Sequence, residues 1–471
     1  MKWFENNQDL FWKSVLFLGI ALNLVALIIS DNGLDYHVKL SYVEVEEGYS
    51  LDWGDVRLDN PNASDPNDAT IFSVKPITTS GKAMAGFCIA ILAAMALLVD
   101  KRFAGLILLN PAMIFSVGKG YDEPTIAVLM GMVVTMLYLS NKMKENWLIK
   151  SFAGLPLVVI LLMKNPSPSD SLLIPTILLI ILLGCSCIIP VRLLRPRLML
   201  GIGFSLGAGL ILLLGILQMG THSIITEETG RFLFSIPFAL LDTVIIYGIF
   251  AMVIWPFAKS TWQKMATSED RLAGELSFLI GGFSGVIMMY VAVLWTYESV
   301  LWGSSWPWHM VTMGNNGRYI TLLIIPAYML VKQVNGEIDW QSKKVFFGIV
   351  LILPFSLLAG LHGQTMWTDD AAQSMDLQEN QDFLFVSEAT LAMHWLYTFH
   401  DPLDAEEKNI TGYWRSDTSS WNNDLDEDLS HIDWLVLAPE IEGNPNGWEL
   451  YDSGEVDFLN GGGEWRVFKR A

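Results

Sequence analysis

The sequence predicts a mainly α-helical, polytopic membrane protein with about 11 transmembrane helices and a small soluble α/β domain at the C-terminus. The chain of 471 residues is 52% hydrophobic and contains 18 Trp, 24 Phe and 21 Met, which is too apolar for a soluble protein of ordinary charge content. Its apolar residues gather in windows long enough to span a bilayer. Of its 49 acidic residues, by contrast, 23 follow the last of these windows, where only 5 Lys and Arg accompany them.

Eleven windows approach the ~17–25 apolar residues that a span needs. They cover residues 11–30, 83–100, 103–118, 125–140, 147–163, 171–190, 198–218, 232–255, 276–297, 318–332 and 345–361. The segments predicted to lie inside carry 16 Lys and Arg, against 8 in the outer segments before residue 362. The positive-inside bias therefore predicts a cytoplasmic N-terminus and an extracytoplasmic C-terminus. We expect a multi-pass protein of the cell membrane, or of the endoplasmic reticulum membrane in a eukaryote.

Two domains follow from the distribution of charge. Residues 1–361 form the transmembrane domain, whose long outer loop covers residues 31–82. Residues 362–471 hold 23 Asp and Glu against 5 Lys and Arg, a net charge of −18 out of −20 for the chain. This acidic domain disfavours nucleic acid or an anionic lipid surface as its partner. Within it, residues 387–400 have the apolar face of a helix, and residues 433–438 and 464–469 have the pattern of strands.

Ionisable residues follow the first predicted span closely. Asp31, Asp35, His37 and Lys39 lie at the end of an apolar helix, where such groups are costly unless they face water or a partner. We interpret this stretch as the edge of an active site. Asp35 and His37 are candidate catalytic residues, and Asp31 and Asp35 are candidate ligands for a divalent metal such as Mg or Mn. The alternative is that Asp31-Asn-Gly only ends the helix and that the charges are solvated.

A second acidic turn is predicted on the same side of the membrane. The span at 103–118 ends at a Gly-Lys-Gly turn that contains Lys119, and the next span opens with Asp122, Glu123 and Pro124. Acidic residues and proline in a first turn are also ordinary signals of a helix start. In the functional interpretation, Asp122 and Glu123 support the catalytic carboxylate and Lys119 contacts a phosphate group.

An arginine at the predicted outer end of a late span adds a third feature. Arg318 lies on the side that the positive-inside bias disfavours, so it needs an anionic partner or open water. A guanidinium holds phosphate oxygens in a bidentate fork. We therefore rank Arg318 first, Lys119 second and Arg231 third as residues that bind a donor phosphate. The alternative is that each side chain only reaches the lipid headgroups.

These segments resemble the GT-C superfamily of polytopic glycosyltransferases. The similarity rests on three motifs, namely Leu34-Asp35-Tyr36-His37, the segment from Asn110-Pro111 to Gly120-Tyr121-Asp122-Glu123-Pro124, and Gly317-Arg318-Tyr319 before Pro326. The plan is also similar, with about eleven helices, a long first outer loop and a soluble outer C-terminal domain. The resemblance implies a polyprenyl-phosphate sugar or lipid-linked oligosaccharide as donor, and a first-loop Asp, here Asp35, as base or metal ligand. The paired acidic motif of the mannosyltransferase branch is not reproduced, because Tyr36 follows Asp35.

The sequence thus predicts a glycosyltransferase that acts at the outer or lumenal face, by inverting transfer with an Asp base. The partners would be a polyprenyl-phosphate sugar, the lipid bilayer and an acceptor that can be a protein, a lipid or a glycan, with no nucleic acid. Two alternatives are a polytopic transporter and a non-catalytic anchor that displays the acidic domain. A transporter is expected to carry charged sites near the middle of its spans, where only Asp242 and Glu275 come close.

Overall fold

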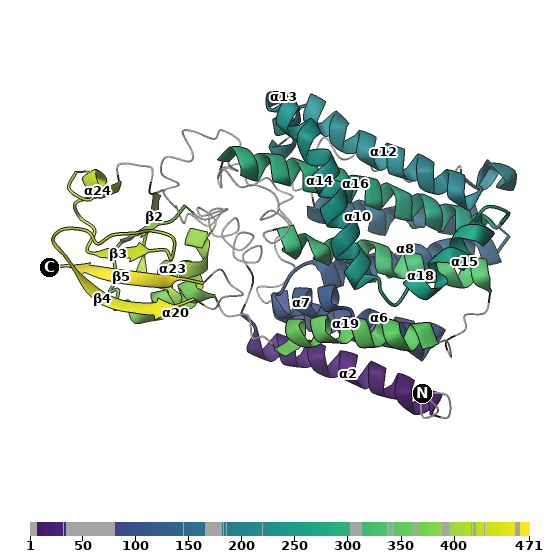
Figure 1. Cartoon of the computed structure of the whole chain (residues 1–471), viewed down its shortest axis with the longest axis horizontal. Helices are drawn as coiled ribbons and strands as arrows, with labels where there is room; N and C mark the ends of the chain where they lie inside the picture. The colour runs from purple at the N-terminus through teal and green to yellow at the C-terminus, as the bar shows by residue number, and fades with distance from the viewer. Residues whose placement is uncertain are drawn as a thin grey trace. The chain divides into compact units, whose positions relative to one another are not determined.

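The structure is a computed structural model that describes two compact units (Figure 1). The described residues are 7–31, 33, 81–144, 146–164, 181, 183–184, 186–218, 220–301, 313–336, 340, 343–361, 366–388, 395–415, 417, 421–427, 429–456 and 462–471. One unit contains the helices up to Leu361. The other contains residues 366–471 together with Ser30 and Asp31.

The first unit is built from helices. These are α2 (Gln8–Ile29), α5 (Gly81–Val99), α6 (Lys101–Leu108), α7 (Pro111–Gly118), α8 (Glu123–Lys142), α9 (Trp147–Phe152), α10 (Gly154–Lys164), η3 (Ser186–Ile188), η4 (Val191–Leu193), α12 (Pro196–Ile216), η5 (Gly220–Ser223), α13 (Ile224–Glu227), α14 (Thr229–Phe250), α15 (Trp255–Met265), α16 (Arg271–Leu301), η6 (Met313–Ile320), α18 (Thr321–Asn335) and α19 (Lys343–Leu361).

Six helices among the described residues are long and apolar enough to cross a membrane, which supports a membrane-embedded protein. They are α2, α8, α12, α14, α16 and α19. Shorter apolar helices occur at Lys82–Met95 and Trp147–Ile160. The predicted number of about eleven spans is not confirmed. The window at 171–190 lies mostly outside the described residues.

Helix α2 shows how an apolar helix chooses its buried face. Its buried residues include Trp12, Val15, Leu22 and Ala26, and their spacing of three, four or seven residues places them on one stripe. Phe17, on another face, is 74% exposed. In a bilayer such an apolar surface is covered by lipid, so packing against other helices and not hydrophobicity selects the buried stripe.

The span predicted at 103–118 is divided into two short helices, α6 and α7. Pro111 has no N–H with which to continue a helix from the preceding turn. Asn110 begins the new one, since its side-chain oxygen accepts a hydrogen bond from the N–H of Ala112 at 3.0 Å. The predicted span with proline in its middle is therefore made of two helices, and the Asn-Pro pair marks the place of the break.

Three other helices make polar contacts with this break. Asn23 of α2 donates to the carbonyl of Leu108 at 2.8 Å, and Ser356 of α19 donates to the carbonyl of Leu109 at 2.6 Å. The Asn110 amide donates to the carbonyl of Phe250, at the end of α14, at 3.1 Å. Interrupted helices are tolerated at membrane depth only when the freed polar groups find such partners. The break between α6 and α7 is therefore stabilised by hydrogen bonds to neighbouring helices.

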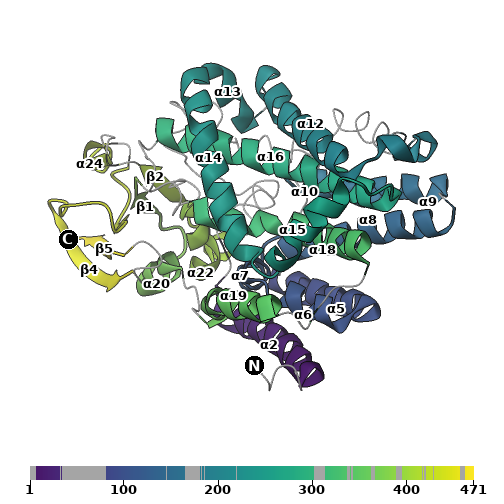
Figure 2. The same cartoon turned by 45° about the vertical axis from the view of Figure 1, so that its right-hand side comes forward.

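Helices α12 and α16 lie side by side in both views (Figures 1 and 2). Glycines bring their backbones together, because a Cβ added at Gly203 or Gly207 would lie 2.3 or 2.0 Å from a carbonyl oxygen of α16. Gly281 and Gly285 of α16 approach α12 equally closely, at 2.1 and 2.2 Å from its carbonyl oxygens. Small residues at four-residue spacing are the usual basis of close helix packing in membranes.

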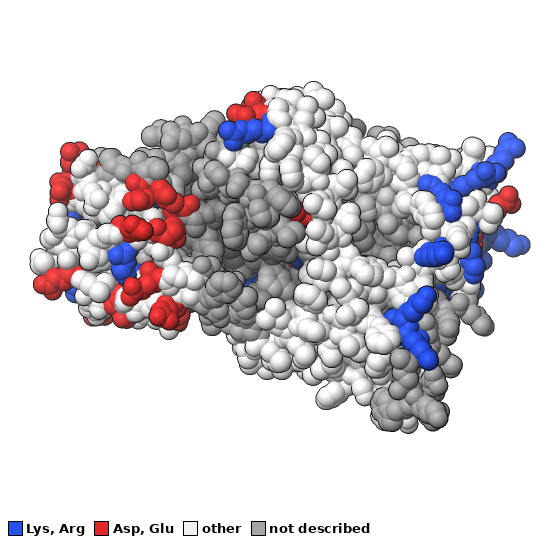
Figure 3. Space-filling model, viewed as in Figure 1, with Lys and Arg blue, Asp and Glu red and all other residues white. Residues whose placement is uncertain are grey.

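Basic residues from the predicted inner segments meet at one end of this unit. Lys13 and Lys101 pair with Asp9, which joins the starts of α2 and α6, and Lys332 at the end of α18 lies over the ring of Phe103 in α6. Arg197 at the start of α12 donates to the carbonyl of Trp262 in α15, and Lys264 of α15 donates to the carbonyl of Asn335 at the end of α18. Figure 3 shows Lys and Arg gathered at this end of the unit. We call it the basic end. The side of a membrane that it faces stays a prediction.

The second unit has a five-stranded sheet in the order β2-β1-β3-β5-β4. Its strands are β1 (Phe383–Val386), β2 (Gly412–Arg415), β3 (Trp434–Leu437), β4 (Trp448–Glu455) and β5 (Glu464–Arg470), with short helices α20 (Trp367–Ser374), η7 (Leu396–Phe399), α22 (His400–Leu403), α23 (Ala405–Lys408) and α24 (Trp421–Asp424). Strand β1 is parallel to β2 and β3, whereas β5 is antiparallel to β3 and β4.

The predicted strands at 433–438 and 464–469 are confirmed as β3 and β5. The predicted helix at 387–400 was wrong at its start, because Ser387 and Glu388 follow β1 without helical structure and residues 389–394 lie outside the described residues. Strands β1 and β3 are buried at every position. Such continuous apolar runs are typical of strands that are covered on both faces.

Candidate functional site

The turn that joins α7 to α8 positions the second group of predicted residues. Gly120 has φ of +67°, a conformation that favours glycine. The N–H of Tyr121 donates to the carbonyl of Ser116 at 2.9 Å, and the N–H of Gly120 donates to that of Val117 at 3.3 Å. This is the Schellman pattern of a helix end. It brings the chain from Lys119 directly into the first turn of α8 at Glu123.

Glu123 forms an ion pair with Arg318 of η6. The Glu123 Oε1 to Arg318 Nε distance is 3.5 Å, and the two side chains are only 1% and 6% exposed. The sequence predicted that Arg318 needs an anionic partner or open water, and the structure provides the partner. Two residues predicted for different tasks, catalysis for Glu123 and phosphate binding for Arg318, are therefore in direct contact.

Aromatic rings surround this pair. The Arg318 guanidinium carbon lies 4.3 Å from the ring centroid of Tyr121 and 5.4 Å from that of Tyr319. Tyr247 of α14 is close enough to Tyr319 and Glu123 to interact with them electrostatically. An aromatic face attracts a guanidinium most strongly away from water. We call Tyr121, Glu123, Tyr247, Arg318 and Tyr319 the Arg318 cluster.

Sequence reasoning missed most of the aromatic members of this cluster. Tyr121 and Tyr319 occur in the quoted motifs without an assigned role, and Tyr247 was not considered. Tyrosine is common in apolar helices, so no local pattern distinguishes a ring that faces Arg318 from one that faces lipid. The one available signal was adjacency, since Tyr319 follows Arg318 and Tyr121 lies two residues before Glu123.

Three further predicted residues of this unit are described. Lys119 is buried at the end of α7, and Asp122 immediately precedes α8. Arg231 is exposed, pairs with Glu228 at 3.7 Å, and donates to the carbonyl of Ser299 at 3.1 Å. The contacts of Arg231 therefore place it on the surface where α14 begins, outside the Arg318 cluster.

The residues predicted after the first span are mostly outside the described part of the chain. Asp35 and His37 are among those not described. Asp31 belongs to the second unit, where its Oδ2 accepts a hydrogen bond from the N–H of Met366 at 2.9 Å. Among the described residues, no group of three or more His, Cys, Asp or Glu is placed to hold a metal ion.

Asp31 also acts on a carboxylate of α20. Burial raises the pKa of Asp370 above its ordinary value of 3.8, and the nearby negative charge of Asp31 raises it further. The folded unit therefore favours the protonated form of Asp370. The stability that this confers is present below pH 3.8 and is lost as the pH rises through the raised pKa.

We therefore expect Asp370→Asn to raise the melting temperature of the full chain's C-terminal unit at neutral pH. The gain should be small, about 0.5 kcal/mol or less, because the carboxylate is largely exposed. It should disappear well below pH 3.8, where Asp370 is already protonated. Thermal unfolding of this unit, detected by its susceptibility to proteolysis, measures the difference in melting temperature between Asp370→Asn and the wild type. Asp426→Asn, at another exposed position, serves as control, and an equal gain there would contradict this account.

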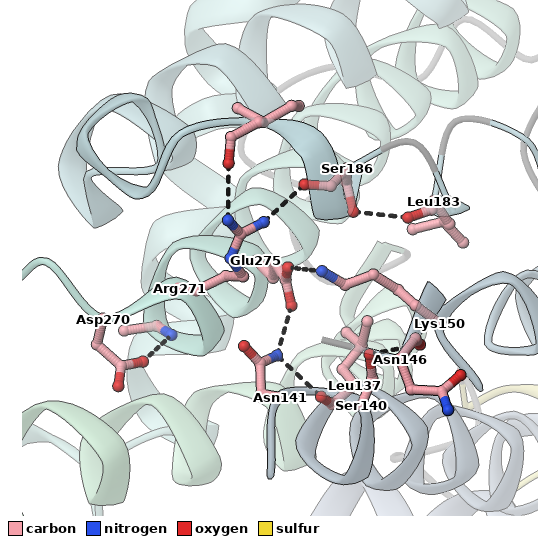
Figure 4. Close-up of polar contacts among 12 residues, drawn as sticks. Leu137, Ser140, Asn141, Asn146, Lys150, Leu183, Ser186, Asp270, Arg271 and Glu275 are labelled. Carbon is pink, nitrogen blue, oxygen red and sulfur yellow. Dashed lines mark hydrogen bonds and ion pairs between the residues drawn. The ribbon is translucent and has the colours of Figure 1, made fainter. Parts of the chain in front are cut away.

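A second buried ion pair lies near the basic end (Figure 4). Lys150 of α9 pairs with Glu275 of α16, and their side chains are 0% and 9% exposed. Asn141 of α8 donates to the other oxygen of Glu275 at 3.1 Å. Arg271, in the same turn of α16 as Glu275, donates to the carbonyl of Ser186 at 2.7 Å. This network ties four segments together.

Comparisons of the chain with protein-family models, with curated proteins and with solved structures found no match.

Proposed function

We propose that the chain is a membrane glycosyltransferase that moves a sugar from a polyprenyl-phosphate-linked donor to an acceptor on the outer or lumenal face. The main support is the Arg318 cluster, in which a buried guanidinium and a carboxylate meet beside the turn that carries Lys119 and Asp122. Transfer from a lipid phosphate uses both kinds of charge, a carboxylate for the acceptor proton and cations for the leaving phosphate. The acceptor class remains open between protein, lipid and glycan.

The proposed reaction is an inverting displacement. The acceptor oxygen forms a bond to the anomeric carbon while the bond from that carbon to the phosphate oxygen breaks on the opposite face. The acceptor proton passes to a carboxylate, and the negative charge remains on the departing polyprenyl phosphate. We assign the proton to Asp35, with Asp122 and His37 in support. We assign the phosphate charge first to Arg318 and second to Lys119.

The ion pair changes the role that we assign to Glu123. The Glu123 carboxylate lies 3.5 Å from the buried Arg318 guanidinium, so it is placed to orient that side chain. We therefore propose that Glu123 holds Arg318 in place and does not accept a proton from the acceptor. One guanidinium carries five N–H donors in a planar fork, so the same arginine can serve a carboxylate and a phosphate oxygen together. Because Arg231 is exposed and pairs with Glu228, we no longer assign the phosphate to it.

A divalent metal such as Mg or Mn remains part of the hypothesis through Asp31 and Asp35. Two carboxylates suit either ion, and the ion would supply further positive charge next to the leaving phosphate. Asp31 already accepts the N–H of Met366 with one oxygen. Asp35 is therefore the stronger candidate ligand.

Transfer and binding assays with the full chain test this function. Asp35→Asn should lower the rate of sugar transfer from a polyprenyl-phosphate sugar at least about 100-fold, as expected for loss of a positioned base. Arg318→Lys should weaken donor binding with little change in melting temperature, because the charge stays and the fork is lost. Arg231→Lys is the matched control and should leave donor binding unchanged. Full transfer activity of Asp35→Asn would exclude Asp35 as the base.

A transporter is the second candidate, and the buried Lys150–Glu275 pair favours it. Buried ionisable residues in membrane helices often mark transport pathways. Asp242 of α14 is also buried. Substrate flux in proteoliposomes that is lost in Lys150→Met and kept in Asp35→Asn would support the transporter. A non-catalytic anchor would show neither flux nor transfer, in the wild type or in either variant.

A further inference from the structure

Helix α15 reaches the basic end of the first unit. Its eleven residues extend ~16 Å at 1.5 Å per residue, about half the ~30 Å of a bilayer core. The C-terminal half of α15 contacts the start of α12 and the end of α18, which both belong to the basic end. Two contacts hold it there. Asn335 donates to the hydroxyl of Thr261 at 2.7 Å, and the ring of Phe257 lies 5.9 Å from that of Trp340.

One stripe of α15 is buried and another is exposed. Thr261 and Met265 are buried. Trp255 and Trp262 are 54% and 49% exposed, and the exposed Lys259 lies between them at spacings of four and three residues. This spacing places the three side chains on one stripe of the helix. A stripe of two indoles with a cation between them is typical of a helix at a membrane interface.

A second helix adds a fixed cation to this stripe. The guanidinium carbon of Arg197, from the start of α12, lies 4.5 Å from the ring centroid of Trp262. Its Nε donates to the backbone carbonyl of Trp262 at 2.9 Å. Lys264 is also exposed and donates to the carbonyl of Asn335 at 3.5 Å. Arg197 thus contacts Trp262 directly, Lys259 shares the stripe of Trp262, and Lys264 lies on another side of α15 at the same end of the unit.

We infer that the C-terminal half of α15 lies in the membrane interface and that Arg197, Lys259 and Lys264, the cations on this part of the surface, bind the phosphate of anionic phospholipid headgroups. Charge complementarity identifies the occupant, because Lys and Arg gather on the surface at this end (Figure 3). The indoles of Trp255 and Trp262 suit the depth where headgroups meet acyl chains. Each basic residue near an anionic lipid surface contributes about fivefold in affinity. The inference does not depend on the proposed transferase activity.

Native mass spectrometry of the full chain in detergent tests this inference. Phosphatidylglycerol and phosphatidylcholine are titrated separately, and retained lipid is counted. The wild type should retain phosphatidylglycerol more strongly than phosphatidylcholine. K259Q/K264Q should weaken phosphatidylglycerol retention about 25-fold, from two losses of about fivefold each. The matched control is K142Q/K144Q, because both lysines are exposed at the end of α8. It should keep wild-type retention.

A second measurement locates α15 without changing its charge. The contribution of Trp255 to the fluorescence is the difference between the wild type and Trp255→Phe. Brominated phosphatidylglycerol in nanodiscs should quench this contribution, because the Trp255 indole would contact lipid. The proposed site would be overturned if the wild type retained phosphatidylglycerol and phosphatidylcholine equally. It would also be overturned if K259Q/K264Q and K142Q/K144Q lost equal amounts of phosphatidylglycerol retention. Competition by inorganic phosphate at similar concentration would also overturn it, by showing an anion site without lipid. Absence of quenching at Trp255 would remove α15 from the interface.

Discussion

Glu123→Gln is expected to lower the free energy of unfolding by about 3–5 kcal/mol. The substitution removes the counter-ion of Arg318 and leaves a guanidinium charge in a site where the side chain is only 6% exposed. Breaking a buried pair from one side costs this much because the remaining charge has lost its partner and cannot regain water. Arg318→Gln should cost a similar amount, since it leaves the Glu123 carboxylate, which is 1% exposed, without its cation.

The double variant Glu123→Gln/Arg318→Gln distinguishes the cost of an isolated buried charge from the cost of losing other contacts of the two side chains. If the cost of each single substitution comes from an isolated buried charge, the double variant should be more stable than either single variant. Reversible unfolding in mixed micelles, followed by tryptophan fluorescence, measures the three free energies. Arg231→Gln is the control, because its pair with Glu228 is exposed and should be worth less than about 1 kcal/mol. Single variants that behave like this control would show that the two charges do not depend on each other.

Gly207→Leu is expected to separate α12 from α16 at a cost of about 3 kcal/mol or more. A Cβ at this position would lie 2.0 Å from the carbonyl oxygen of Gly282, so the two backbones must move apart before any larger side chain can fit. Overpacking typically costs about 1–3 kcal/mol, and the upper end applies here because the obstructing atom belongs to the backbone. The same unfolding measurement reports the loss.

Gly209 provides a matched control on the same helix. A Cβ at Gly209 meets nothing within 4 Å, so Gly209→Leu should be neutral or should stabilise α12 by about 0.5–1 kcal/mol through helix propensity. The two variants change the same residue type only two positions apart. Equal melting temperatures for both would show that the close approach of α12 and α16 does not limit stability.

Hydrophobic length was readable from the sequence because it is a local property. The windows at 11–30, 125–140, 198–218, 232–255, 276–297 and 345–361 coincide with the six helices that are long and apolar enough to cross a membrane. A helix in lipid satisfies its own backbone hydrogen bonds, so its position needs little information from the rest of the chain. The break at Asn110-Pro111 shows the limit, since the window resembled a single span while the capping asparagine and proline divide it.

The second unit was harder to predict. Strands β3 and β5 were anticipated, but β1 is a run of only four apolar residues. Such a run cannot be distinguished from part of a buried helix by periodicity. Its pairing with β2 and β3 decides its conformation, and these partners come from later parts of the chain. The expected helix at 387–400 therefore began too early.

By itself, the sequence determined that this protein is apolar enough for a membrane, that its acidic charge is concentrated behind residue 362, and that Arg318 needs a partner or water. These conclusions depend on composition and on the cost of placing charge in apolar surroundings. Only the tertiary structure decided that the partner of Arg318 is Glu123, that Tyr121 and Tyr319 lie against the guanidinium, and that Asp31 contacts Met366. All of these pairs except Arg318 with Tyr319 join residues that are distant in the chain, and no local pattern of side chains specifies which of several carboxylates a buried cation will meet.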